Sequence, residues 1–188
     1  MIAPRLQGAR VILRLPGDDD AERLASFQRD NRERFAELGT QPPEEFYTSE
    51  WWLRRIAALE QQRRADRLLY FVAAPAEQPD AIAGVVSFTQ IAFAPSYSCM
   101  LGAAVDARYE GRGLMRESIA LAITHVFGAM NLHRIGAEYA VSNERSARLL
   151  ARLGFRDEGL LRQYKRHDGK WQDYVAAALL NERWRAPE

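Results

Sequence analysis

The residues whose types and spacing could do chemistry begin with a glycine-containing segment, RYEGRG at residues 108–113. It stands between a predicted strand and a predicted helix, so its backbone N–H groups could hold a phosphate at the positive end of the helix dipole. A dinucleotide-binding fingerprint would need a third glycine where Arg116 stands, and a Walker loop would need Lys and then Ser or Thr after Gly113. Both nucleotide motifs are excluded, which leaves a phosphate-binding loop of another kind or a plain tight turn.

The strands that must position this segment are indicated by apolar runs bounded by turn residues. The expected strands are residues 11–15, 68–74, 81–88, 98–105, 134–140, 155–166 and 171–180. A turn with two prolines separates the second run from the third, which favours an antiparallel pair. The last two runs should form a hairpin across Asp168-Gly169, a preferred two-residue turn.

Four helices are predicted from apolar residues spaced three and four apart. Their core-facing stripes are Ala21, Leu24 and Phe27 after the acidic residues 18–20, then Trp52, Ile56 and Leu59 in a helix from Thr48, then Met115, Ile119, Ala122 and Val126 in residues 114–127. Gly128 should end the third helix, and Asn143 should cap a fourth at residues 143–153. The pattern predicts one α/β or α+β domain over residues 1–188, with a single mixed, mostly antiparallel, curved sheet and helices on both faces.

The composition bounds the function. Lys and Arg total 26 against 25 Asp and Glu, so the net charge of +1 gives no broad electrostatic reason to bind nucleic acid. Only two of those basic residues are lysines, Lys165 and Lys170. The single cysteine, Cys99, excludes an intrachain disulfide, and it shows no metal-ligand spacing with the three histidines. No segment has the apolar length of a signal peptide or a membrane span, so we expect a cytoplasmic protein without a metal or membrane contact.

Two motifs together resemble the GNAT family of acyl-CoA-dependent N-acetyltransferases. Residues 108–113 match that family's (Gln/Arg)-x-x-Gly-x-(Gly/Ala) signature, by which it holds the pyrophosphate of coenzyme A. Downstream, NERS at residues 143–146 and LLARLGF at residues 149–155 resemble its Asn-x-x-Ser helix and the Leu-Gly-Phe that closes it. The stretches that look closest to the RimJ-type ribosomal-protein-alanine acetyltransferases are HRI at 133–135, GLM at 113–115, LLARLGF again, and DGxWxD at 168–173.

The resemblance implies the GNAT fold over nearly the whole chain, with acetyl-CoA as co-substrate. In that fold the strands at residues 98–105 and 134–140 splay apart to admit the pantetheine arm, which main-chain groups near Val105 would bind. The residues that the resemblance assigns to the cofactor are Val105, Arg108, Glu110, Gly111, Arg112, Gly113, Leu114, Met115, Asn143 and Ser146.

The chemistry that the resemblance implies is direct attack of an amine on the thioester, so Cys99 is not needed as a nucleophile. Ser146 is the candidate donor to the departing thiolate, and its other interpretation is a small polar residue in a helix turn. Glu138 is the candidate base, although related enzymes often carry their glutamate where this chain has Gly136. A proton relay through water is the alternative. Glu138 and Tyr139 point to opposite faces, so only one of them can point toward the acetyl group.

The acceptor that the resemblance implies is the N-terminal α-amine of a ribosomal protein, with association with the ribosome as a further expectation. An α-amine has a pKa of about 7.7–8.0 against about 10.4 for lysine, so it needs only a mild base at cellular pH. One rival is acetylation of a small-molecule amine, such as an antibiotic or a polyamine. Another is a module that binds acyl-CoA or ribosomal precursors without turnover. The choice between monomer and homodimer stays open.

Three further features have both a functional and a structural interpretation. The aromatic residues could contact a peptide end or pack in the core, where Trp52 fits better than Trp51. The arginines could dock near ribosomal RNA or form a solvated face. His133 could act as a base, but we expect it to be structural. The aromatic residues are Phe46, Tyr47, Trp51 and Trp52, and the arginines are Arg32, Arg34, Arg54, Arg55, Arg63 and Arg64.

Overall fold

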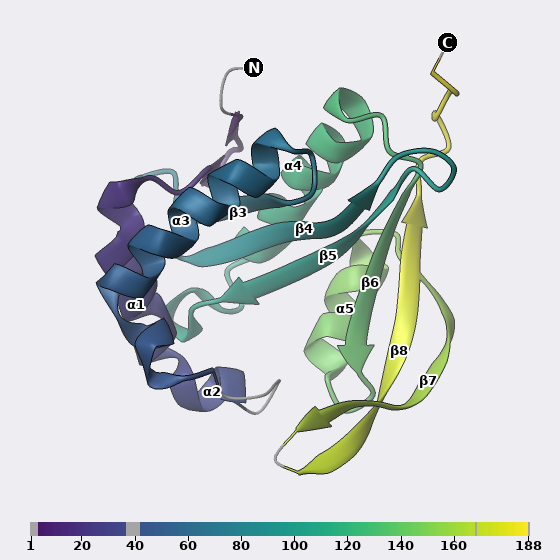
Figure 1. Ribbon diagram of the computed structural model, residues 1–188. Coiled ribbons are helices and arrows are strands. Elements are labelled where there is room, and N and C mark those ends of the chain that lie inside the picture. Colours follow the sequence, from purple (N-terminus) through teal and green to yellow (C-terminus); the bar gives the residue numbers. More distant parts are fainter. Residues whose placement is uncertain (1–3, 37–41, 168, 188) are drawn as a thin grey trace.

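The computed structural model describes residues 4–36, 42–167 and 169–187, which form one sheet with helices around it (Figure 1). The strands are β1 (Arg5–Gln7), β2 (Val11–Arg14), β3 (Leu69–Pro75), β4 (Gly84–Ala92), β5 (Ser98–Val105), β6 (Arg134–Ala140), β7 (Arg156–His167) and β8 (Lys170–Leu180). The helices are α1 (Ala21–Asp30), α2 (Arg32–Ala36), α3 (Ser49–Arg64), α4 (Leu114–Ala129) and α5 (Glu144–Arg152), with 3-10 turns at Asp18–Asp20, Glu44–Tyr47 and Ala107–Tyr109.

The strands lie side by side in the order β1-β2-β3-β4-β5-β6-β8-β7. Every neighbouring pair is antiparallel except β5 with β6, which run parallel. The predicted mixed, mostly antiparallel sheet is therefore confirmed, and Figure 1 shows that it curves from the N-terminal strands to the β7–β8 hairpin.

Helices cover both faces of the sheet, as predicted, because the central strands are apolar on both sides. On β3, Phe71 packs in one core cluster with Ile119 of α4, whereas the next residue, Val72, packs in a second cluster with Leu24 of α1 and Trp52 of α3. This alternation is the period of two that a strand imposes on its side chains. The sheet therefore holds α4 on one side and the α1–α3 pair on the other.

The sheet opens between β5 and β6. Their pairing runs from Ser98 with Arg134 to Leu101 with Ala137 and goes no further. Beyond that point the two strands diverge (Figure 1). The splay expected between residues 98–105 and residues 134–140 is therefore confirmed, and these two ranges are β5 and β6.

The structure differs from the sequence prediction in its smallest elements. The three-residue β1 and the five-residue α2 were not predicted, because such short segments carry no readable periodicity. Gly128 does not end α4, which continues to Ala129. One glycine costs a helix only about 1 kcal/mol, which the packing of α4 outweighs. The β7–β8 hairpin is confirmed by its pairing, although Asp168 of the expected turn lies outside the described residues.

Candidate functional site

The glycine segment forms a loop between β5 and α4 that presents free backbone donors. Gly111 and Gly113 take φ of +72° and +74°, a conformation that side chains disfavour. Gly113 is the N-cap of the 16-residue α4 and supplies no side-chain cap. In the described chain, the N–H groups of residues 111–113 have no hydrogen-bond partner, and the first turn of α4 adds further unpaired donors. These unpaired N–H donors favour the interpretation of the segment as an anion-binding loop over that of a plain tight turn.

A buried carboxylate fixes the start of this loop. Asp106, only 1% exposed, accepts hydrogen bonds from the backbone N–H and the guanidinium of Arg108 and from the amide of Asn31. Burial alone would raise the pKa of Asp106, but these hydrogen bonds outweigh it and lower the pKa. Asn31 in turn accepts from the N–H of Ala107 at 3.0 Å. Arg108 is thus directed at Asp106, and Asp106 and Asn31 hold the start of the loop although the sequence did not predict them.

Arginines from three distant segments tie the loop to its surroundings. Glu110 forms ion pairs with Arg34 of α2 and with Arg145 of α5. Arg34 also donates to the carbonyl of Val105 at the end of β5. On the other side, Arg10 donates to the carbonyl of Arg112 at 3.3 Å and to Glu117 at 2.9 Å. The sequence predicted Val105, Glu110 and Arg112 as site residues but none of these arginine partners.

Asn143 and Ser146 lie together at the start of α5. Asn143 is the N-cap, as predicted, and its Oδ1 accepts from the N–H of Ser146 at 3.0 Å. The hydroxyl of Ser146 has no hydrogen-bond partner among the described residues. Because α5 follows the diverging end of β6 and Arg145 joins it to the glycine loop, the start of α5 lies near the opening in the sheet.

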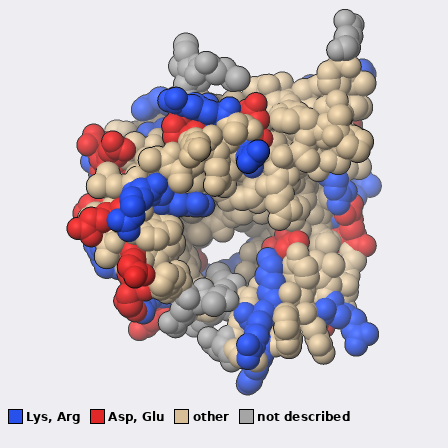
Figure 2. Space-filling model, viewed as in Figure 1, with Lys and Arg blue, Asp and Glu red and all other residues tan. Residues whose placement is uncertain are grey.

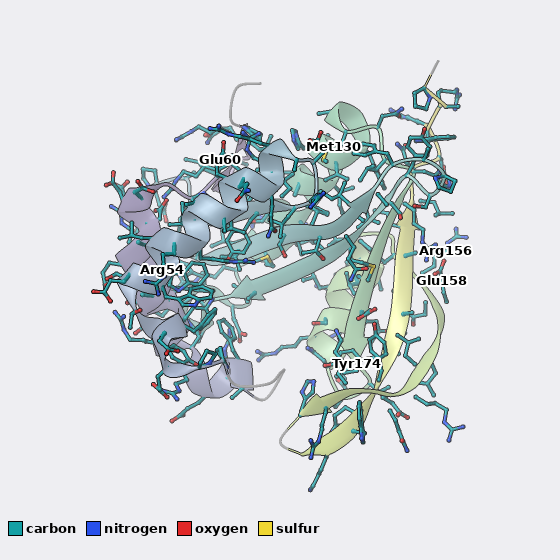
Figure 3. The ribbon with its side chains drawn as sticks, in the orientation of Figure 1. Arg54, Glu60, Met130, Arg156, Glu158 and Tyr174 are labelled. Atoms are coloured by element: carbon teal, nitrogen blue, oxygen red, sulfur yellow. The ribbon has the colours of Figure 1, made fainter. Side chains whose placement is uncertain are left out.

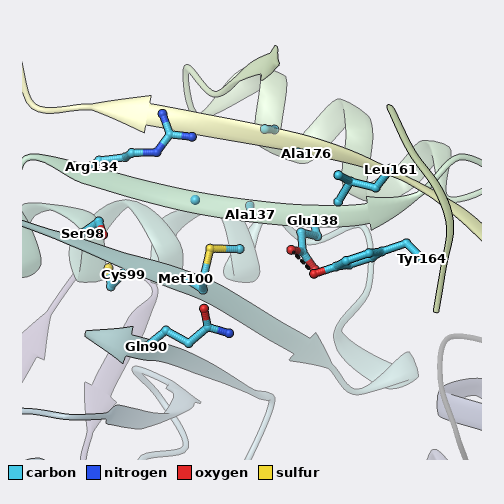
Figure 4. A pocket seen from close by; sticks show the side chains of 12 residues that line it. Gln90, Ser98, Cys99, Met100, Arg134, Ala137, Glu138, Leu161, Tyr164 and Ala176 are labelled. Atoms are coloured by element: carbon cyan, nitrogen blue, oxygen red, sulfur yellow. Dashed lines mark hydrogen bonds between the residues drawn. The ribbon is translucent and has the colours of Figure 1, made fainter. Parts of the chain in front are cut away.

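A cavity of about 310 Å³ lies on the face of the sheet opposite α4 and α5, where β4 to β8 curve around it (Figure 4). Glu138 lies in its wall with the side chain 18% exposed. Its Oε1 accepts from the hydroxyl of Tyr164 at 2.8 Å, and its Oε2 lies 2.9 Å from the Nζ of Lys165. Tyr139, the next residue, points to the other face and donates to Asp157, so the predicted alternation is confirmed. Figure 2 shows this side of the molecule hollowed between the α1–α2 region and the β7–β8 hairpin.

Cys99 and His133 have surroundings that suit structural roles. Burial raises the pKa of the Cys99 thiol to about 12, which leaves essentially no thiolate at neutral pH. The ring of His133 packs against Trp184 at 5.3 Å, and its backbone N–H donates to the carbonyl of Tyr97. Cys99 lines the same cavity as Glu138, but in the described part of the chain neither residue has a hydrogen bond or ion pair with Glu138 or Ser146.

The aromatic and arginine clusters are mostly engaged within the chain. Trp52 is 3% exposed and packs in the core, whereas Trp51 is only half-buried, as predicted. Four of the six arginines form ion pairs: Arg32 with Glu44, Arg34 with Glu110, and Arg63 and Arg64 with Glu60. Figure 3 shows Arg54 and Glu60 on α3, and Figure 2 shows charges of both signs mixed on the face in view. The arginines therefore form no separate basic patch on that face.

Two features are absent from the described parts of the chain. Among those residues, no group of three or more His, Cys, Asp and Glu side chains could hold a metal ion. In the same residues, no helix has the length and apolar character needed to cross a membrane.

Known proteins resemble this chain in sequence and in structure. The family model described as an acetyltransferase (GNAT) domain matches residues 10–156. The ribosomal protein uS5-alanine N-acetyltransferase of Escherichia coli is 32% identical over 180 residues, which cover 96% of this chain and 92% of that protein. The solved ribosomal-protein-S5-alanine acetyltransferase of Vibrio fischeri superposes with a TM-score of 0.93 at 31% identity, covering 97% of this chain and 100% of that one. RimJ of Mycobacterium smegmatis, solved with CoA-disulfide, superposes with a TM-score of 0.85 at 26% identity, covering 96% and 87%.

Proposed function

Since this chain belongs to the GNAT family of acetyltransferases, we propose that it transfers the acetyl group of acetyl-CoA to the N-terminal α-amine of a ribosomal protein in the cytoplasm. One observation supports a ribosomal protein as the acceptor. The GNAT match ends at residue 156, where β7 begins, whereas the similarity to the uS5-alanine enzyme of Escherichia coli covers 96% of the chain. That similarity therefore includes strands that line the cavity as well as the cofactor loop.

The residues present fit acetyl-CoA, which supplies an activated acetyl thioester. The free N–H groups at residues 111–113 and the N-terminus of α4 suit a pyrophosphate, and two glycines without a Cβ allow its close approach. Beyond the loop, the unpaired stretch of β5 after Leu101 offers main-chain groups to a pantetheine arm. The residues that we assign to the cofactor are Val105, Arg108, Glu110, Gly111, Arg112, Gly113, Leu114, Met115, Asn143 and Ser146.

Two side chains assist the reaction, Glu138 as the general base and Ser146 as a hydrogen-bond donor to the leaving group. Glu138 takes the proton of the incoming ammonium, and the neutral amine then attacks the thioester carbonyl carbon. The C–S bond breaks while the hydroxyl of Ser146 donates a hydrogen bond to the departing thiolate, and the second proton of the nitrogen leaves as the thiolate is protonated to free CoA. Tyr164 keeps the carboxylate of Glu138 in place, and this hydrogen bond and burial raise the pKa of Tyr164, so the phenol stays protonated.

The charge of the cavity favours a peptide end over a polyamine. Among the described residues that line the cavity, Glu138 is the single carboxylate, and the guanidinium of Arg134 is already paired with Glu158. A polycation would be attracted by several carboxylates, whereas one carboxylate is sufficient for one α-ammonium. We therefore favour a protein N-terminus over a polyamine.

A direct test compares acceptors of different kinds with the purified chain and acetyl-CoA. A peptide with a free N-terminal alanine should be acetylated, and the same peptide with a blocked N-terminus and one internal lysine should not be. Mass profiling of N-termini in cells with and without the gene then identifies the substrate by the loss of an acetyl shift of about 42 Da. If spermidine or another small amine is acetylated faster than the peptide, that amine takes the place of the proposed acceptor. If none of the amines is acetylated, the result contradicts catalysis.

Replacing Ser146 with alanine should lower kcat and kcat/KM together by about 10-fold to 100-fold, which is about 1.4–2.7 kcal/mol. The hydroxyl acts mainly in the transition state, so the Kd of CoA should hardly change. Steady-state kinetics and a thermal melt measure both. Ser142→Ala, at an exposed position just before α5, is the matched control and should turn over normally. A Ser146→Ala variant with normal turnover and a slightly lower Tm would assign Ser146 to helix structure alone.

A further inference from the structure

Lys165 holds its ammonium group where the proposed mechanism needs an acceptor amine. Its Nζ lies 2.9 Å from Oε2 of Glu138, and a general base must come within about 2.6–3.2 Å of the nitrogen that it deprotonates. The rings of Tyr164 and Tyr174 lie 5.3 Å and 4.8 Å from this Nζ, so one carboxylate and two aromatic faces surround it. We propose that Lys165 is an intramolecular acetyl acceptor, a modification site that the chain acetylates itself. This inference rests on the proposed function.

A bulge in β7 brings Lys165 to this position. Residues 162–164 face a single residue of β8, so the strand carries two extra residues here. Gln163 takes φ of +48°, and its N–H donates to Oδ1 of Asp173 at 2.7 Å. In a regular strand, Tyr164 and Lys165 would point to opposite faces. The bulge turns both side chains to the carboxylate of Glu138, so the backbone of β7 determines the position of Lys165.

The reaction is the one already proposed, with Nζ of Lys165 as the nucleophile. The ammonium gives one proton to the carboxylate of Glu138, and the neutral amine attacks the thioester carbonyl carbon. An N–C bond forms, the C–S bond breaks, and the nitrogen loses its second proton as the thiolate leaves and is protonated. The products are Nε-acetyl-lysine, free CoA and one proton. Acetylation removes the charge of Lys165, and with it the ion pair that now occupies Oε2 of Glu138.

The chain supplies its own control, because Lys165 and Lys170 are its only lysines. Lys170 is exposed at the start of β8. Both residues meet the same solution of acetyl-CoA, so chemical acetylation by the thioester alone should label Lys170 at least as fast as the half-exposed Lys165. Faster labelling of Lys165 than of Lys170 would therefore show that Glu138 and its surroundings promote the reaction.

The experiment incubates the purified full chain with acetyl-CoA that carries a deuterated acetyl group, and peptide mass spectrometry then measures the label on each lysine. We expect Lys165 to be labelled about 100-fold faster than Lys170, at a rate independent of protein concentration. Glu138→Gln should reduce labelling at Lys165 to the level at Lys170. Lys165→Arg should leave only that background, and Lys170→Arg should leave labelling at Lys165 intact.

Equal labelling of the two lysines, or labelling of Lys165 that persists in Glu138→Gln, would overturn the inference. The same samples are assayed with the N-terminal alanine peptide, which separates the two proposals. Peptide acetylation without label on Lys165 would overturn self-acetylation alone. Label on Lys165 with no acetylation of any protein N-terminus would support the site chemistry and contradict the proposed acceptor.

Discussion

Replacing Gly111 with valine should weaken CoA binding by about 100-fold or more, which corresponds to about 2.7 kcal/mol. Gly111 takes φ of +72°, which a β-branched residue adopts only as an outlier, and its N–H belongs to the free donors of the loop. No heavy atom lies within 4 Å of its Cβ position, so the fold has room for the side chain, which would instead block an approaching phosphate. Calorimetric titration with CoA measures the loss, and a melt should report a Tm lower by only about 5 °C.

The matched control is Gly128→Ala in α4, where again no heavy atom lies within 4 Å of the Cβ position. Alanine is the better helix former by about 1 kcal/mol, so this variant should melt slightly higher and bind CoA normally. Unchanged CoA affinity in Gly111→Val would mean that the loop is only a turn. The cofactor assignment of residues 110–115 would then have to be withdrawn.

The sequence predicted the strand, glycine loop and helix at residues 98–129 well because their signals are local. Glycines at 111 and 113, a strand before them and an amphipathic helix after them lie within one short stretch, and Asn143 caps α5 just as its position indicates. The residues that hold the loop escaped prediction because their partners are distant in sequence. Asn31 binds the N–H of Ala107 across 76 positions, and no period of apolar residues encodes such a contact.

The surroundings of Glu138 were harder to predict because they depend on an irregular strand. Alternation placed Glu138 and Tyr139 correctly on opposite faces of β6, since β6 is regular. The same rule applied to β7 would have separated Tyr164 from Lys165, yet the bulge brings both to Glu138. An exposed strand with little periodicity gives no signal for a bulge. The lysine beside the proposed base therefore becomes visible only in the structure.

Replacing Glu138 with glutamine should lower kcat by about 100-fold or more near pH 7 while the Kd of CoA stays the same, because the amide keeps the shape of the side chain but cannot take a proton. The hydrogen bond from Tyr164 can be kept by the amide oxygen, so the cavity wall should hold. Glu60→Gln is the matched control. It removes a carboxylate that also pairs with basic side chains, but on α3, away from Tyr174 and the hairpin (Figure 3).

The pH dependence of this defect separates a base from a structural carboxylate. An α-amine loses its proton at a pH of about 7.7–8.0, so above that range the acceptor arrives neutral and no longer needs Glu138 to deprotonate it. The ratio of wild-type to Glu138→Gln rates should therefore shrink as the pH rises from about 7 to about 9. If the Glu138 carboxylate only positioned other groups and took no proton, the ratio of the two rates would not change with pH. A loss below about 10-fold at pH 7, or a constant ratio, would assign the proton to a water relay instead.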